Sequence, residues 1–106
     1  MNKILFIITG SIAAPKCLEI FKELNPKKFQ ISCLLTKEAK KYIKIQDIKR
    51  YAKKRIFKDE TEIKNKMLHI TLSRINDIIL VCPASANTIA KYANGYGDNL
   101  ASNTLL

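Results

Sequence analysis

Small and hydroxyl-bearing residues stand directly after three apolar runs of the chain. Gly10, Ser11 and Ile12 come after residues 4–8, Thr36 follows residues 29–35, and Pro83, Ala84, Ser85, Ala86, Asn87 and Thr88 follow residues 77–82. Glycine lets a backbone approach a ligand closely, and the amide groups at a helix start favour an anion. These residue types therefore suit a phosphate. The alternative is that Ser11, Thr36 and Ser85 only cap helices.

The first of these segments does not follow the G-x-G-x-x-G pattern of dinucleotide-binding proteins. A mononucleotide with a single phosphate fits the spacing better than a dinucleotide does.

His69 is the only histidine of the chain. An imidazole with a pKa of about 6.5 can act as a general base near neutral pH. Its neighbours Met67, Leu68 and Ile70 are apolar, which equally fits a structural histidine. The sequence pattern leaves both roles open.

The elements that would position these residues alternate between strands and helices. Residues 4–8, 29–35 and 77–82 are continuous apolar runs, typical of strands buried on both faces of a parallel sheet. Helical spacing is found in 12–24, with Pro15 in the first turn, in 37–43, in a stripe through Ile45, Ile48, Ala52 and Ile56, and in 86–93 before Asn94-Gly95. Residues 59–65 suggest a loop or a helix start, and 67–72 are ambiguous. This order predicts an α/β, Rossmann-like parallel sheet.

Three strands are few for such a sheet, and a further strand is expected after the last helical segment, 98–106. We therefore expect a domain that is truncated at its C-terminus or completed by a partner.

Composition and charge exclude several classes of protein. The chain has 106 residues and a net charge of +10, and residues 37–58 hold ten Lys and Arg against Glu38 and Asp47. This basic segment fits a solvated helical face, a rim that attracts phosphate, or nucleic-acid binding. Three cysteines without a CxxC pair argue against disulfides and zinc, and favour the cytoplasm. No apolar run is long enough for a membrane span.

Several motifs occur in a fixed order along the whole chain: Gly10-Ser11-Ile12-Ala13-Ala14 with Lys16, Thr36 with Ala39, His69-Ile70-Thr71-Leu72, Pro83-Ala84-Ser85-Ala86-Asn87-Thr88-Ile89-Ala90-Lys91, and Ala93-Asn94-Gly95 with Asp98 and Leu100. In this combination they resemble the homo-oligomeric flavin-containing cysteine decarboxylases. That family includes phosphopantothenoylcysteine decarboxylase and the lantibiotic peptidyl-cysteine decarboxylases. The run at 83–91 is the most specific of the motifs.

The resemblance implies one incomplete FMN-binding flavoprotein domain over residues 1–106. The flavin phosphate and ribityl chain would be held by Gly10, Ser11, Ile12 and Thr36, and the cradle would be completed by Ala84, Ser85, Ala86, Asn87 and Thr88. His69 would be the catalytic residue, close to the flavin and facing a neighbouring subunit of a trimer or dodecamer. The substrate would be 4′-phosphopantothenoylcysteine, oxidised by the flavin and decarboxylated to 4′-phosphopantetheine in coenzyme A biosynthesis.

The chain also departs from that family. Pro15 replaces a common tyrosine, and Arg74-Ile75-Asn76 replaces a tryptophan-containing stretch. The family's carboxylate-binding Pro-x-Met-Asn motif and its later substrate clamp would lie beyond residue 106. The chain could thus be one part of a split enzyme with a separate C-terminal polypeptide, a copy that has lost activity, or an FMN-binding or regulatory module. A nucleic-acid-binding domain, whose binding would weaken with salt, is the rival from another class. Asn87 and His69 argue against a flavin prenyltransferase.

Overall fold

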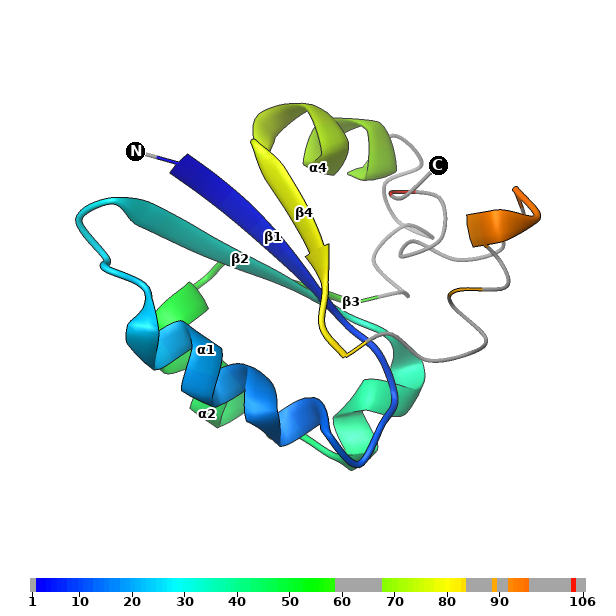
Figure 1. The fold of residues 1–106 in the computed structure, drawn as a ribbon, viewed down its shortest axis with the longest axis horizontal. Coiled ribbons are helices and arrows are strands. Elements are labelled where there is room, and N and C mark those ends of the chain that lie inside the picture. The colour runs from blue at the N-terminus through cyan, green and yellow to red at the C-terminus, as the bar shows by residue number, and fades with distance from the viewer. Residues whose placement is uncertain (1, 59–67, 84–88, 90–91, 96–103, 105–106) are drawn as a thin grey trace.

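A four-stranded parallel sheet forms the centre of the molecule. The computed structural model describes residues 2–58, 68–83, 89, 92–95 and 104. In these, β1 (Asn2–Ile8), β2 (Phe29–Leu35), β3 (Ile56–Lys58) and β4 (Ile78–Val81) pair in the order β3-β2-β1-β4. Helices α1 (Cys17–Glu23) and α2 (Ile45–Ala52) cover one face, and α4 (Leu68–Ile75) covers the other (Figure 1). The predicted Rossmann-like α/β fold is confirmed.

The central strands are apolar throughout because both faces of the sheet are covered. Ile4, Phe6 and Ile8 of β1 pack into a core with α1 and α2. Leu5 and Ile7 point to the opposite face, as the twofold alternation of a strand requires. The continuous runs 4–8 and 29–35 therefore mark strands between two helical layers, as predicted.

The first predicted helix, 12–24, is divided into two parts. A 3-10 turn over Ala14–Lys16 contains Pro15, and α1 follows it. Proline is tolerated there because the first turn of a helix needs no intrahelical donor. Phe21 of α1 meets Phe6 of β1 edge-on, with ring centroids 4.7 Å apart, which fixes the helix on the sheet.

Two predictions about strands are wrong. Ile56 was assigned to a helical stripe, whereas α2 ends at Ala52 and Ile56 begins β3. The second concerns β4, which was predicted to be buried on both faces. Ile78 and Leu80 are 48% and 40% exposed, because no described helix covers β4 on the side of α1.

The ambiguous segment 67–72 belongs largely to α4. Leu72 is fully buried against Leu5, Ile7 and Leu34. The side chain of Asn76 donates a hydrogen bond to the carbonyl of Leu72, 2.9 Å away, and so satisfies a carbonyl in the last turn of the helix.

Near the end of the described chain, Ile89, Tyr92 and Ala93 are helical. Gly95 adopts φ of 65° and donates to the Tyr92 carbonyl, which agrees with the predicted stop at Asn94-Gly95. Residues 59–65, 84–88 and 98–103, to which sequence patterns also assigned structure, lie outside the described residues. Among the helices that are described, none has the length and apolar character needed to cross a bilayer.

Candidate functional site at the carboxyl end of the sheet

The strand order creates a topological switch point between β1 and β4. From β1 the chain moves outward to β2 and then β3, and it returns to the other side of β1 with β4. In open parallel sheets, ligands bind at such a point, outside the carboxyl ends of the strands. The loop that starts at Thr9 and the segment that starts at Cys82 flank this position (Figure 1).

Three contacts hold the segment after β4 beside the end of β1 and the start of α1. The amide of Cys82 donates to the Ile7 carbonyl at 3.0 Å. The hydroxyl of Thr9, which is 1% exposed, donates to the Pro83 carbonyl. The thiol of Cys17, at the start of α1, donates to the Cys82 carbonyl at 2.6 Å. The segment that leads into residues 84–88 is therefore fixed beside the loop after β1.

The loop after β1 presents three consecutive amide groups. Among the described residues, the amides of Gly10, Ser11 and Ile12 donate no hydrogen bond. The next two amides are engaged within the loop, since Ala13 donates to Ser11 Oγ at 3.1 Å and Ala14 donates to the Ser11 carbonyl at 2.9 Å. Successive backbone amides in a loop can bind an anion. The predicted phosphate-binding residues therefore have donors to offer.

Gly10 has a packing role that the sequence did not reveal. A Cβ atom at Gly10 would stand 2.4 Å from Cβ of Glu38 and 3.2 Å from its carbonyl carbon. Any side chain at Gly10 would therefore push apart the loops that follow β1 and β2. The glycine does allow a close approach, as the sequence suggests, but the residue that comes close to it in the described structure is Glu38.

Thr36 lies beside this loop, directly after β2. Its amide and hydroxyl both donate to the Ile8 carbonyl, at 3.1 and 3.4 Å. No side-chain cap bond is formed at the helical turn that Thr36 precedes. Thr36 therefore stands at the N-cap position of this turn but does not cap it through its side chain. Ser11 likewise makes a local turn bond to Ala13 instead of capping the 3-10 turn.

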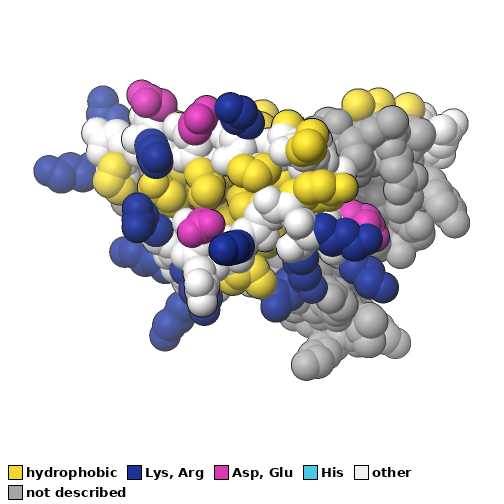
Figure 2. All heavy atoms as spheres, turned by 90° about the horizontal axis from the view of Figure 1, so that it is seen from below, with side chains coloured by type: hydrophobic (Ala, Val, Ile, Leu, Met, Phe, Trp, Pro, Cys, Tyr) yellow, Lys and Arg dark blue, Asp and Glu magenta, His cyan; other side chains and the backbone are white. Residues whose placement is uncertain are grey.

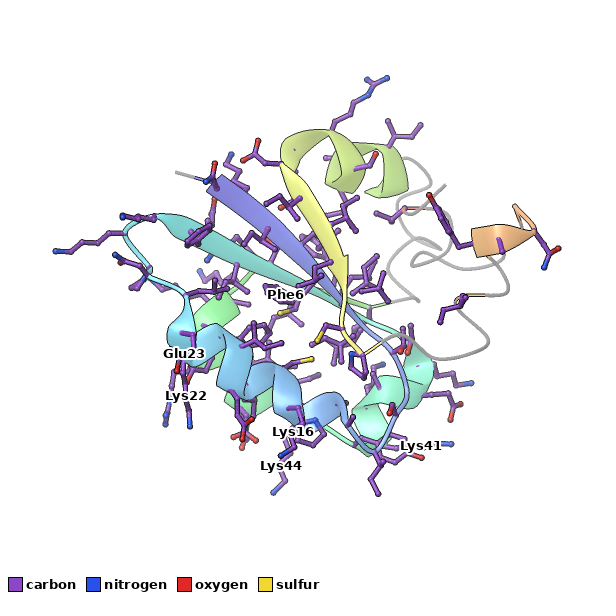
Figure 3. All side chains as sticks on the ribbon, in the orientation of Figure 1. Phe6, Lys16, Lys22, Glu23, Lys41 and Lys44 are labelled. Atoms are coloured by element: carbon purple, nitrogen blue, oxygen red, sulfur yellow. The ribbon has the colours of Figure 1, made fainter. Side chains whose placement is uncertain are left out.

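Positive charge predominates around the site. The turn Lys37–Lys41 holds three lysines and Glu38, and exposed Lys16 ends the neighbouring 3-10 turn, with its Nζ 3.9 Å from Glu19. Lys41 pairs with Glu38 at 2.7 Å, and this hydrogen bond lowers the pKa of the glutamate. Figure 3 shows Lys16, Lys41 and Lys44 on the same side of the molecule. This distribution favours an anionic ligand.

The cysteines near the site are structural. Burial is the main cause that raises the pKa of the Cys17 thiol to about 12, and the neighbouring Cys82 raises it further. Burial also raises the pKa of the Cys33 thiol. Both thiols are therefore protonated at neutral pH and are poor nucleophiles. Across residues 2–58 and 68–83, no group of His, Cys, Asp and Glu side chains is placed to hold a metal ion.

The remaining predicted site residues are only partly described. His69 lies in the first turn of α4, and its side chain is outside the described part of the structure. Because α4 leads back to β4, its first turn is the end nearer the carboxyl side of the sheet (Figure 1). Ala84, Ser85, Ala86, Asn87 and Thr88 lie outside the described residues.

Sequence reasoning missed Thr9 and Cys17. Both donate to carbonyls of the segment after β4. A signal for Thr9 was present, since it is a polar residue placed directly after an apolar strand. Cys17 gave none, because its partner is 65 residues away in sequence.

Comparison with known proteins gives consistent matches over the whole chain. The sequence model of the family described as "Flavoprotein" matches residues 1–106. A protein of Streptococcus mutans named probable phosphopantothenoylcysteine decarboxylase is 32% identical over 99% of this chain and 60% of its own length. Among solved structures, the peptidyl-cysteine decarboxylase EpiD is 34% identical, with a TM-score of 0.79 over 98% of this chain and 63% of its own. The FMN binding protein AtHal3 is 27% identical, with a TM-score of 0.81 over 98% and 58%. The chain thus spans about three fifths of the length of each.

Proposed function

Because the chain belongs to the flavoprotein family, we propose that it binds FMN at the switch point between β1 and β4. We further propose that it serves the decarboxylation of 4′-phosphopantothenoylcysteine to 4′-phosphopantetheine in coenzyme A biosynthesis. The similarity to a probable phosphopantothenoylcysteine decarboxylase and to EpiD supports the reaction class. AtHal3, named as an FMN binding protein, supports the cofactor.

The row of unengaged amides at Gly10, Ser11 and Ile12 is the observation that carries the proposal. It suits the phosphate of a mononucleotide, because consecutive backbone N–H groups can donate hydrogen bonds to the phosphate oxygens even though they carry no full charge. The lysines at Lys16 and in the turn Lys37–Lys41 strengthen that attraction.

In this proposal, Gly10, Ser11 and Ile12 hold the phosphate, and Thr36 lies against the ribityl chain. The cradle is completed by Ala84, Ser85, Ala86, Asn87 and Thr88. When bound, FMN would supply the two-electron redox chemistry that makes loss of carbon dioxide from a cysteine derivative feasible. His69 would move a proton at the substrate, the role that a neutral-pH imidazole performs best.

We also propose that the chain works as a homo-oligomer in the cytoplasm. Ile12 is 87% exposed at the candidate site, and Ile78 and Leu80 are exposed on β4. Association would cover these apolar side chains. The thiols of Cys17, Cys33 and Cys82 are all free, which suits a reducing compartment.

Turnover of the FMN-saturated chain with 4′-phosphopantothenoylcysteine tests the reaction, with 4′-phosphopantetheine measured by mass spectrometry. We expect product with the native chain, alone or together with a separate polypeptide that carries the Pro-x-Met-Asn motif. With His69→Asn we expect FMN binding without product. Binding of FMN with no turnover under either condition would refute the decarboxylase and favour the alternative, an FMN-binding or regulatory module.

A further inference from the structure

A concavity lies at the amino end of the sheet, away from the candidate flavin site. It is an open groove of about 540 Å³ where the ends of α1 and α2 meet the start of β2. Its lining residues are Phe21, Lys22, Leu24, Pro26, Phe29, Gln30, Ile31, Arg50, Tyr51, Lys53 and Arg55. A smaller hollow of about 160 Å³ between α1 and α2 shares Lys22, Arg50 and Tyr51 with it. We call the larger one the amino-end groove.

The walls of the amino-end groove are aromatic and ordered by the core. Phe21 is 1% exposed, and its ring centroid lies 5.6 Å from that of the half-buried Tyr51. Phe29, at the start of β2, is half-buried as well. The Nε atom of Arg55 donates to the Ile31 carbonyl at 3.0 Å, which holds this guanidinium in the wall. A planar apolar ring would find a preformed surface here.

Four cations border the amino-end groove: Lys22, Arg50, Lys53 and Arg55. Its lining includes no acidic residue, although Glu23 lies between the lining residues Lys22 and Leu24 in the sequence, and Asp47 lines the smaller hollow. Within the described ranges 2–58 and 68–83, none of the four cations forms an ion pair. Figure 2 shows apolar side chains crossing this face, with Lys and Arg side chains on both sides of them.

The basic segment 37–58 is thus divided between the two ends of the molecule. The turn Lys37–Lys41 and Lys44 stand by the carboxyl end of the sheet, and Arg50, Lys53 and Arg55 stand by the amino end. Figure 3 shows the same separation along α1, with Lys16 just before its start and Lys22 near its end. The proposed FMN site accounts only for the first group.

We propose that the amino-end groove binds an aromatic polyanion of the nucleoside polyphosphate class. The base would pack against Tyr51 and Phe29, and the phosphates would pair with Arg50, Lys53 and Lys22. Guanidinium groups pair with phosphate oxygens through two parallel hydrogen bonds. The groove volume of about 540 Å³ falls in the range of small-ligand sites. A concave aromatic wall beside clustered cations fits a compact ligand with a ring better than an extended acidic peptide.

Calorimetric titration of the full chain with ATP, adenosine and tripolyphosphate, in saturating FMN, tests this. Excess FMN occupies the proposed flavin site, and the charge-reversal variants described next distinguish the two sites if FMN does not bind there. We expect ATP to bind, and adenosine and tripolyphosphate each to bind at least about tenfold more weakly, because each lacks one half of the recognition. Equal affinity for tripolyphosphate and ATP would overturn the aromatic part of the proposal, and no binding of ATP would overturn all of it.

Charge reversal at the two ends of α2 locates the site. Arg50→Glu should weaken ATP binding by about tenfold or more, whereas Lys44→Glu, the same charge change at the other end of the helix, should leave it within about twofold. Arg50→Gln provides a milder variant, and thermal melts check that each variant folds. Equal loss with Arg50→Glu and Lys44→Glu would show attraction to net charge only. Displacement of ATP by a poly-glutamate peptide that binds more tightly would point to an acidic protein partner and contradict the proposal.

Discussion

At the scale of single residues, the proposed FMN site depends mainly on the amide groups in the loop after β1 that donate no hydrogen bond. Replacing Ile12 by proline removes one N–H from an exposed position, whereas Ile12→Ala keeps it. We expect Ile12→Pro to weaken FMN binding by about tenfold relative to Ile12→Ala, since one hydrogen bond to a charged group is lost. A fluorescence titration of FMN measures the ratio. Equal affinity of the two variants would remove this amide from the phosphate site.

Gly10 makes a different prediction, because its described contact is Glu38. Gly10→Ala places a Cβ atom 2.4 Å from the Glu38 Cβ, and overpacking of this kind costs about 1–3 kcal/mol. Urea denaturation should show that loss, and Glu38→Gly in the same chain should recover part of it. Additive effects of the two substitutions would contradict the contact. The sequence identified Gly10 as a place of close approach but could not name Glu38, because the contact joins two separate loops.

The buried thiol of Cys17 should make stability depend on alkaline pH. Its pKa is about 12 in the folded chain, against an ordinary value of 9.0. The unfolded chain therefore loses this proton first, and the free energy of unfolding should fall as the pH rises above 9.0. Below that pH the contribution is constant. The decline is at most about 1.4 kcal/mol per pH unit for one thiol.

Urea denaturation of native and Cys17→Ala chains between about pH 7 and pH 10.5 measures this effect as a difference in slope. The variant should lose stability less steeply with pH, whatever its absolute stability. Identical slopes would contradict the assignment of a buried, protonated Cys17.

Among the elements, the end of α2 shows where sequence patterns fail. Ile56 follows Ala52 at helical spacing, so the stripe predicted one continuous helix. The backbone instead turns at Lys53, with φ of 56° and ψ of −117°, and Ile56 pairs with Cys33 in β3. Such a turn is usually marked by glycine, and a lysine gives no such signal.

Lys53→Gly should therefore stabilise the chain by about 1 kcal/mol, because a side chain is costly at positive φ. Lys54→Gly, next to it, is the matched control and should be neutral or slightly destabilising. Thermal unfolding compares the two. Lys53 also lines the amino-end groove, so Lys53→Gly should bind ATP more weakly although it is more stable. A destabilised Lys53→Gly would contradict the strained turn.

Strand β4 illustrates a second limit of prediction. Its residues 78–81 are as apolar as those of β1, and the sequence therefore predicts burial on both faces. Ile79 and Val81 pack on the side of α4, whereas Ile78 and Leu80 remain exposed. An apolar run shows that a strand can be buried but not which neighbours cover it. By contrast, β1 and β2 were predicted well because the central position covers both faces.

At the scale of the whole molecule, the sheet separates two anion-attracting ends. The carboxyl end joins the switch point, the amides after β1 and the turn Lys37–Lys41. The amino end carries the groove with Lys22, Arg50 and Arg55. Parallel strands of one sheet are joined by short, right-handed connections. For this reason the sequence could predict which loops meet at the proposed flavin site. The amino-end groove could not be predicted, because it depends on how α1, α2 and β2 pack.

The most direct test of the central claim is the visible absorbance spectrum of the purified chain, taken after incubation with FMN and removal of free ligand. We predict flavin bands near ~450 nm that stay with the protein, a released cofactor with the mass of FMN, and a higher melting temperature in its presence. A colourless protein that FMN neither colours nor stabilises would contradict an FMN site at the junction of β1 and β4.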